Sequence, residues 1–267
     1  MEEPNNAEWQ APPPPEGPAP EPEQPEMSEV ATLGNIFIEP GRTFEDLRRK
    51  PRFIMAIVLS VILVMIFSIL FAQKLGDDRV RRFIAAEIEK NPQAAAMSPD
   101  QKKQTIDLQM TIASVVRYAL PIFMVIIFVV GGLLYWLGAK AMGGEMSFTQ
   151  ALSVFVYSGL PPTIIVMVAN IVVIFLKNMD DVDIAASQRG LINANLGFFF
   201  DGKAMPVLVT LLSVIDVFQI WGWFLAALGL KKVGKMSSAS AWTIVLVLAL
   251  IGVAFRVVGA AMSGNPG

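Results

Sequence analysis

The sequence predicts an all-α membrane protein: a bundle of about five transmembrane helices, the third one broken, preceded by an amphipathic interfacial helix and a disordered Pro/Glu-rich tail. Two observations lead to this class. Hydrophobic residues make up 54% of the chain and charged residues only 16%, whereas a soluble domain carries about a quarter charged residues. Apolar segments of about 20 residues recur, and a helix of that length crosses the ~30 Å hydrocarbon core of a bilayer.

Residues 1–28 are predicted to form an acidic, proline-rich tail. Half of the 18 prolines precede position 26, and they are interleaved with glutamates. Prolines favour extended polyproline segments and the glutamates repel one another, while almost nothing apolar is available to bury. We therefore expect a disordered spacer. A docking site for a proline-recognising partner is the functional alternative.

Residues 29–52 form an amphipathic, basic segment next to the first apolar span. Thr43 is predicted to cap a short helix, with Asp46 three residues later in the manner of a capping box, and Pro51 ends that helix. We expect the helix to lie in the membrane interface with its basic side on anionic phospholipid headgroups. The residues assigned to this headgroup contact are Arg42, Arg48, Arg49, Lys50 and Arg52.

Residues 53–262 are predicted to form the membrane domain. Its first span carries no charge over about 20 apolar residues. Two helices are expected in the polar region that follows, one from Asp77 to Lys90 and one that begins after Ser98 and continues into the second span. The five predicted spans cover about 53–72, 118–138, 149–176, 206–230 and 241–262.

The third span contains a motif that is expected to interrupt it. Gly159, Pro161 and Pro162 lie in the middle of its apolar stretch. Proline lacks an amide donor and disfavours helical conformation in the residue before it, so two helical pieces are predicted. Broken backbone at membrane depth is stable only where protein or a water-filled cavity covers it.

Two charged residues are expected inside the membrane. Asp216 is the only carboxylate in the interior of a predicted span, and Arg256 is the most deeply placed basic residue. They lie ~21 and ~24 Å from the turn between the fourth and fifth spans, at a rise of ~1.5 Å per residue. The sequence predicts a salt bridge between them, direct or bridged by Gln219 or a water. We interpret it as a structural clamp, and a transport or proton site is the alternative.

The composition excludes many kinds of chemistry. The chain has no cysteine and no histidine, so disulfides, thiol chemistry, His-based catalysis and the usual zinc ligands are all missing. A single buried carboxylate cannot serve an aspartyl mechanism, which needs two. We therefore expect no enzyme activity, no catalytic residues, no metal site and no cofactor. The net charge of −2 argues against nucleic acid as a partner.

Four stretches of the chain resemble the Yip family, membrane proteins named for interaction with Ypt/Rab GTPases. The first is Phe37-Ile38-Glu39-Pro40-Gly41-Arg42-Thr43-Phe44 with Leu47 and Pro51, and the second is Gly143-Gly144-Glu145-Met146-Ser147-Phe148 with Ala151. The third is Tyr157-Ser158-Gly159-Leu160-Pro161, and the fourth is Ile215-Asp216-Val217-Phe218-Gln219-Ile220-Trp221 with Leu228-Gly229-Leu230. Together they cover most of the chain apart from the tail.

This resemblance implies five spans and a cytoplasmic N-terminus, which agrees with the basic residues that precede the first span. The chain has Leu47-Arg48-Arg49-Lys50-Pro51 where the eukaryotic members carry Asp-Leu-Tyr-Gly-Pro. That difference argues against Rab GTPase binding and favours the bacterial-type branch. We therefore expect a multi-pass protein of the bacterial inner (plasma) membrane.

Three functional hypotheses remain open. The leading one is a non-enzymatic scaffold that contacts lipid headgroups and binds membrane-protein or homo-oligomeric partners. The second is a small solute or ion transporter or channel, which would use the broken third span and the Asp216/Arg256 pair. The third is a membrane-shaping protein that acts through residues 29–52.

Overall fold

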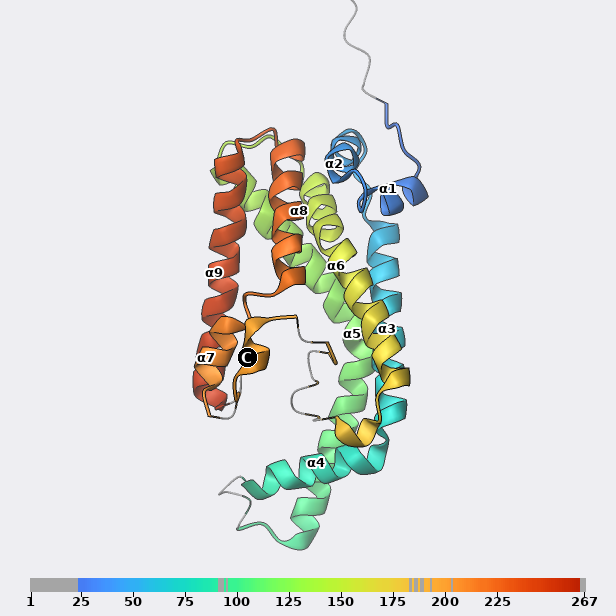
Figure 1. Ribbon diagram of the computed structural model, residues 1–267, viewed down its shortest axis with the longest axis vertical. Helices are drawn as coiled ribbons and strands as arrows, with labels where there is room; N and C mark the ends of the chain where they lie inside the picture. The colour runs from blue at the N-terminus through green and yellow to red at the C-terminus, as the bar shows by residue number, and fades with distance from the viewer. Residues whose placement is uncertain are drawn as a thin grey trace, which may run out of the picture.

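The structure, a computed structural model, describes residues 24–90, 94, 96–182, 184, 187, 190–192, 194–202 and 204–264. The regular elements within these ranges are helices (Figure 1). In addition, one isolated β-bridge pairs Asn195 with Asp216. The predicted all-α class is therefore confirmed for the described part of the chain. Most of the predicted disordered tail, positions 1–23, lies outside the described residues.

Four of the described helices are long and apolar enough to cross a membrane, and four of the five predicted spans coincide with them. They are α3 (Ile54–Leu75), α5 (Pro99–Ala141), α6 (Phe148–Leu176) and α9 (Ser238–Ser263). The fourth predicted span is instead two shorter helices, α7 (Pro206–Leu212) and α8 (Val217–Val233), which both contact α9. The 17 residues of α8 rise about 25 Å, less than the ~30 Å core.

Helix α6 is the centre of the bundle and contacts α3, α5 and α8. Close approach of α5 to α6 depends on small residues. A Cβ atom on Gly132 would lie 2.9 Å from the Cα of Leu152, and one on Gly131 would overlap the ring of Phe155. Glycines of this kind let transmembrane helices pack backbone to backbone, where van der Waals contact provides the association energy.

Helix α6 is continuous through Pro161 and Pro162, so the predicted break of the third span is wrong. Both prolines and the preceding Leu160 are buried. Opposite them, α8 has Gly222, where a Cβ would meet the Ser158 carbonyl oxygen at 3.7 Å and Pro162 Cγ at 3.8 Å. The Ser158 carbonyl, which has no helical amide partner at Pro162, therefore faces protein instead of lipid, and this helps the helix continue past the prolines.

Helix α4 (Asp77–Lys90) and the first turns of α5 project from the end of the bundle where α3 ends (Figure 1). Ile84 and Ile88 of α4 form a small separate core against Ile106 and Met110 of α5. The predicted start of α5 is confirmed, because Ser98 and Gln101 form a capping box.

The opposite end of the bundle carries α1 (Glu29–Asn35) and α2 (Pro40–Arg49), which lie beside the ends of α6 and α8 (Figure 1). Two short 3₁₀ helices, η2 (Met179–Asp181) and η4 (Leu196–Phe199), belong to the segment between α6 and α7. Of these, η4 contacts α7.

Candidate functional site

The N-terminal cap, defined here as residues 24–52, is docked on the bundle by its apolar face. Phe44 and Leu47 of α2 are completely buried, and α2 contacts α8 and α6. Phe44 fits where α8 has no side chain, since a Cβ on Gly229 would lie 2.8 Å from Phe44 Cε1 and 2.7 Å from Val154 Cγ1. The apolar face of α2, which a helix lying in the membrane interface would bury in lipid, is therefore covered by protein.

A buried ion pair stabilises the inside of the cap. Arg52 Nη2 lies 3.2 Å from Asp46 Oδ2, and both side chains are almost fully buried. Arg52 also donates a hydrogen bond to Thr32 Oγ1 at 2.9 Å, which connects this pair to α1. A buried ion pair costs desolvation energy, and leaving one partner alone there costs about 3–5 kcal/mol. The assignment of Arg52 to headgroup contact is therefore wrong.

The other oxygen of the Asp46 carboxylate binds the chain that precedes α1. Asp46 Oδ1 accepts hydrogen bonds from the backbone amides of Glu26 at 2.6 Å and Met27 at 3.3 Å. Residues 24–28, predicted as the end of the tail, are thereby attached to α2. The predicted capping box is also wrong, because Glu39 occupies the N-cap position of α2 and the Thr43 hydroxyl donates to the Glu39 carbonyl.

The Glu26 side chain forms a second connection between the tail and α2. Its carboxylate lies 2.5 Å from Arg49 Nη1 and 3.3 Å from Arg42 Nη2, so one carboxylate bridges two guanidinium groups. Hydrogen bonds from Arg49 and Arg42 hold the pKa of Glu26 below its usual range. The carboxylate is therefore ionised near neutral pH, and this connection weakens only in acid.

Two further contacts attach α2 to the bundle. Lys232 of α8 forms an ion pair with Glu45 at 2.5 Å. Gln150, in the capping box of α6, donates from Nε2 to the Arg48 carbonyl at 2.7 Å. Nearby, the Glu145 amide donates to the Gly234 carbonyl at 3.0 Å, which joins the α5–α6 turn to the α8–α9 turn.

The second candidate region is the break between α7 and α8 at residues 213–216. Asp216 is the N-cap of α8, and its Oδ1 accepts from the amides of Phe218 at 2.9 Å and Gln219 at 3.0 Å. The flanking backbone pairs with Ala194 and with Leu196, the first residue of η4. Leu196 N–H donates to Ile215 O at 3.3 Å, and Val217 N–H donates to Ala194 O at 3.2 Å. These bonds replace the helical ones that would otherwise join α7 to α8.

Arg256 of α9 reaches this break but does not pair with Asp216. Its Nη2 donates to Ser213 Oγ at 3.1 Å, and Ser213 in turn donates to the Thr210 carbonyl at 2.8 Å. The ion pairs found within the described ranges do not include Asp216 with Arg256. The predicted direct salt bridge is wrong because the carboxylate caps its own helix, three residues beyond the serine that Arg256 binds.

Asn170 of α6 attaches the polar loop to the bundle. Its side chain is fully buried, and its Oδ1 accepts from the amides of Leu191 at 2.5 Å and Ile192 at 3.2 Å. Its Nδ2 donates to the Val166 carbonyl at 2.8 Å. This amide thus satisfies backbone donors of an irregular segment that runs beside the apolar helices.

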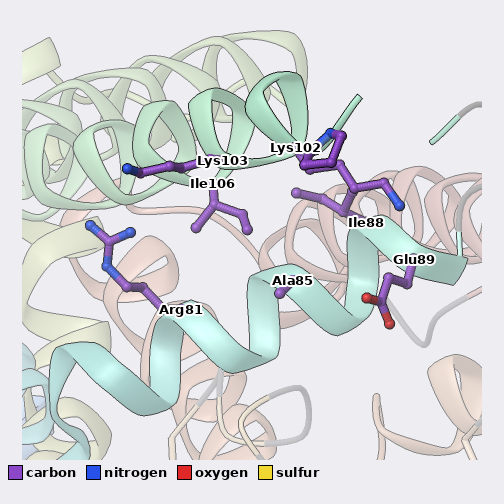
Figure 2. A pocket seen from close by; sticks show the side chains of 8 residues that line it. Arg81, Ala85, Ile88, Glu89, Lys102, Lys103 and Ile106 are labelled. Carbon is purple, nitrogen blue, oxygen red and sulfur yellow. The ribbon is translucent and has the colours of Figure 1, made fainter. Parts of the chain in front are cut away.

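A cleft of about 320 Å³ opens between α4 and α5 at the far end of the molecule (Figure 2). Ile88, Ile106 and Ala85 form its apolar part, and Lys102, Lys103 and Glu89 lie around it. Arg81 also lines it and is paired with Asp107 at 2.6 Å. Charges of both signs surround a small apolar space, so the cleft selects no particular ligand chemistry.

Several residues of these sites were not recognised in the sequence. Asp46 was assigned to a helix cap instead of a buried pair, and Glu26 was counted as one of the tail acids. Ser213 had a usable signal, because it is a polar residue in an apolar stretch and must find a hydrogen-bond partner there. Gly229 had no such signal, because its role depends on the position of Phe44.

The fold and these sites define a multi-pass helical membrane protein whose N-terminal segment is folded onto one end of its bundle. Parts of three of the stretches that resemble the Yip family meet at that end. Phe44 packs against Gly229, and the Glu145 amide donates to the Gly234 carbonyl, four residues after Leu230. The model of the Yip1 domain matches residues 34–260. The chain belongs to this family.

A curated bacterial relative is similar over nearly the whole chain. It is membrane protein YknW of Bacillus subtilis (strain 168), 23% identical over 225 residues, which are 83% of this chain and 86% of the relative. Its name describes a membrane protein and gives no activity. No solved structure was found to match the chain.

Proposed function

We propose that this protein is a non-enzymatic scaffold of the bacterial inner membrane. In this proposal its spans bind other membrane proteins or a second copy of the chain, and the N-terminal cap lies at the cytoplasmic surface. One observation carries the proposal: the polar side chains in and beside the spans hold segments of the chain itself together. Asp216 caps α8, Ser213 binds Arg256, and Asn170 holds the loop at Leu191 and Ile192.

Catalysis has little support in the chain. Histidine and cysteine are missing from the whole sequence, which removes the usual bases, nucleophiles and zinc ligands. Groups of three or more acidic residues that could hold a metal ion are not found among the described residues. The proposal therefore includes no catalytic residue and no cofactor.

The transporter alternative depended on a break in the third span and on an Asp216–Arg256 pair. The third span is continuous, and the direct pair is replaced by the Asp216 cap and the Ser213–Arg256 bond. The remaining support for transport is the break between α7 and α8. The contacts at that break hold two segments together, which favours a structural role over a transport role.

The proposed surroundings follow from the family and from charge. A bacterial relative supports the bacterial inner membrane, and the basic residues before the first span support a cytoplasmic N-terminus. The exposed apolar side chains of the spans fit acyl chains or partner helices. The net charge of −2 gives no support for nucleic acid as a partner. The Asp-Leu-Tyr-Gly-Pro motif is missing, so the sequence gives no support for Rab GTPases as partners either.

A reconstitution experiment tests the proposal. Purified protein in liposomes should give no ion or solute flux above protein-free vesicles, and crosslinking in native membranes should give discrete complexes. Asp216→Asn should leave the crosslinking pattern unchanged if the fold is kept. Flux that is abolished by Asp216→Asn would overturn the scaffold proposal in favour of a transporter. A chain that crosslinks only to lipid would overturn it as well.

A further inference from the structure

Arg42 and Arg49 of α2 form a clamp around the Glu26 carboxylate. The two residues are seven positions apart, close to two helical turns, so their side chains leave the same face of α2. That face is opposite the one buried through Phe44 and Leu47. Glu26 fills the clamp, with its carboxylate 2.5 Å from Arg49 Nη1 and 3.3 Å from Arg42 Nη2.

The chemistry of the clamp fits a phosphate group. Guanidinium groups bind carboxylate and phosphate through the same forked donors, and a phosphate offers more acceptor oxygens than a carboxylate. The position also fits a lipid headgroup. Helix α2 lies at the end of the bundle where α3 begins (Figure 1), and Arg49 precedes Ile54, the first residue of α3, by only five positions.

We propose that Arg42 and Arg49 bind the phosphate of an anionic phospholipid and that Glu26 is the internal competitor for this site. When lipid occupies the clamp, the Glu26 side chain is displaced and the tail before Glu26 moves away from α2, while the Glu26 and Met27 amides stay bound to Asp46. This inference rests on the proposed placement of the cap at the membrane surface. It adds to the scaffold proposal a ligand and a mechanism that exposes or covers the tail.

The rest of the cap explains why displacement does not unfold it. The buried Arg52–Asp46 pair and the packing of Phe44 do not involve the Glu26 side chain. The Glu26–Arg contacts are exposed to solvent, and an exposed ion pair contributes only about 0.2–1 kcal/mol. Six more glutamates precede Glu26, and an anionic membrane surface repels them. Anionic lipid therefore both competes for the clamp and disfavours the bound tail.

The absence of cysteine from the chain makes a direct test possible. A spin label on Gln24→Cys is attached to the only thiol and reports the mobility of the tail beside the clamp. The full-length protein is placed in nanodiscs of phosphatidylcholine alone or of phosphatidylcholine mixed with phosphatidylglycerol. The ratio of mobile to immobilised label should rise about 1.4- to fivefold in the anionic nanodiscs, the factor expected for losing an exposed ion pair.

Three variants separate the clamp from general electrostatics. Glu26→Gln should give the mobile spectrum in both lipids. Arg42→Gln combined with Arg49→Gln should also do so, and should lose bound phosphatidylglycerol in native mass spectrometry. Glu39→Gln removes the other carboxylate near Arg42, at 3.5 Å, and should keep the normal response to lipid. A second label at Ile38→Cys, in the exposed turn between α1 and α2, should stay unchanged wherever the cap is folded.

Two results would overturn the inference. The first is equal label mobility in both kinds of nanodisc while Glu26→Gln still releases the tail. The Glu26 contacts would then hold the tail, but lipid would not compete for them. The second is full release by inorganic phosphate in phosphatidylcholine nanodiscs at matched ionic strength, which would assign the clamp to a soluble anion. Neither result affects the flux and crosslinking outcomes that test the scaffold proposal.

Discussion

The third and fourth predicted spans differ in a way that reverses the usual expectation for proline. Helix α6 contains Pro161 and Pro162 and runs without interruption for 29 residues. The segment from α7 to α8 has no proline between Leu212 and Val217, yet its helix stops there. The prolines of α6 are buried against α8, whereas the residues of the break bind partners from outside their own helix.

This difference shows which groups decide helix continuity inside this membrane protein. Proline removes one amide donor, and a protein neighbour can cover the carbonyl group that remains. Asp216 does more, because its carboxylate competes for the amides that would otherwise continue the helix. The loop at Ala194 and Leu196 then pairs with the released backbone.

The largest expected effect comes from the α6 side chain that holds the loop. Asn170→Leu leaves the partly buried Leu191 and Ile192 amides without an acceptor, at about 1–3 kcal/mol for each. Unfolding in mixed micelles should show a loss of about 2–6 kcal/mol in the free energy of unfolding. Val172→Leu, on an exposed position of α6, is the matched control and should be nearly neutral. A neutral Asn170→Leu would mean that the loop does not depend on α6.

The next effect comes from the bond between the break and α9. Ser213→Ala removes one acceptor of Arg256 and should cost about 1.5–3 kcal/mol, the range for hydrogen bonds to charged groups. Ser60→Ala is the control, because that buried hydroxyl donates only to the Ala56 carbonyl of its own helix. The same micelle titration compares them. Equal losses of unfolding free energy in the two variants would show that the Arg256 contact does not stabilise the break between α7 and α8.

The helix cap at the break should have a smaller effect. Asp216→Ala removes two hydrogen bonds to α8 and should cost about 0.5–2 kcal/mol. Hydrogen exchange should become faster at the Phe218 and Gln219 amides, while the Val217 amide stays protected by Ala194. Ser237→Ala, the N-cap of α9, should cost a similar amount without this local change. Slower exchange across 213–217 would instead mean that the acid alone breaks the helix.

The smallest effect is expected at the prolines of α6. Pro161→Ala allows a helical hydrogen bond to the Tyr157 carbonyl, worth about 1 kcal/mol, and loses a similar amount of buried ring surface. The free energy of unfolding should therefore change by less than about 1 kcal/mol. A gain of about 3 kcal/mol, the usual cost of proline inside a helix, would show that α6 is strained there and would weaken the comparison.

Much of the fold could be predicted from the sequence because bilayer helices are specified locally. The first and fifth predicted spans, 53–72 and 241–262, agree with α3 and α9 to within a few residues. The helix from Asp77 to Lys90 and the start of α5 after Ser98 are also confirmed. These elements depend on the length of an apolar segment and on capping residues within a few positions of its ends. Both can be read directly from the sequence.

The sites could be predicted only in part, because they depend on which segments meet. The predicted partner of Arg256, Asp216, lies within one helical turn of the observed partner, Ser213. Arg256 binds Ser213 instead because the Asp216 carboxylate faces its own helix. The basic residues of the cap were recognised, but not that Asp46 would bury Arg52 or that Glu26 would bridge Arg42 and Arg49. Those contacts join residues up to 23 positions apart.

The length of α5 has a structural consequence. Its 43 continuous residues extend about 65 Å, twice the thickness of the hydrocarbon core. One end is braced by α4, and the other is followed by the turn that binds Gly234 beside the N-terminal cap. One unbroken helix therefore connects the projecting end of the molecule with the turn beside the N-terminal cap.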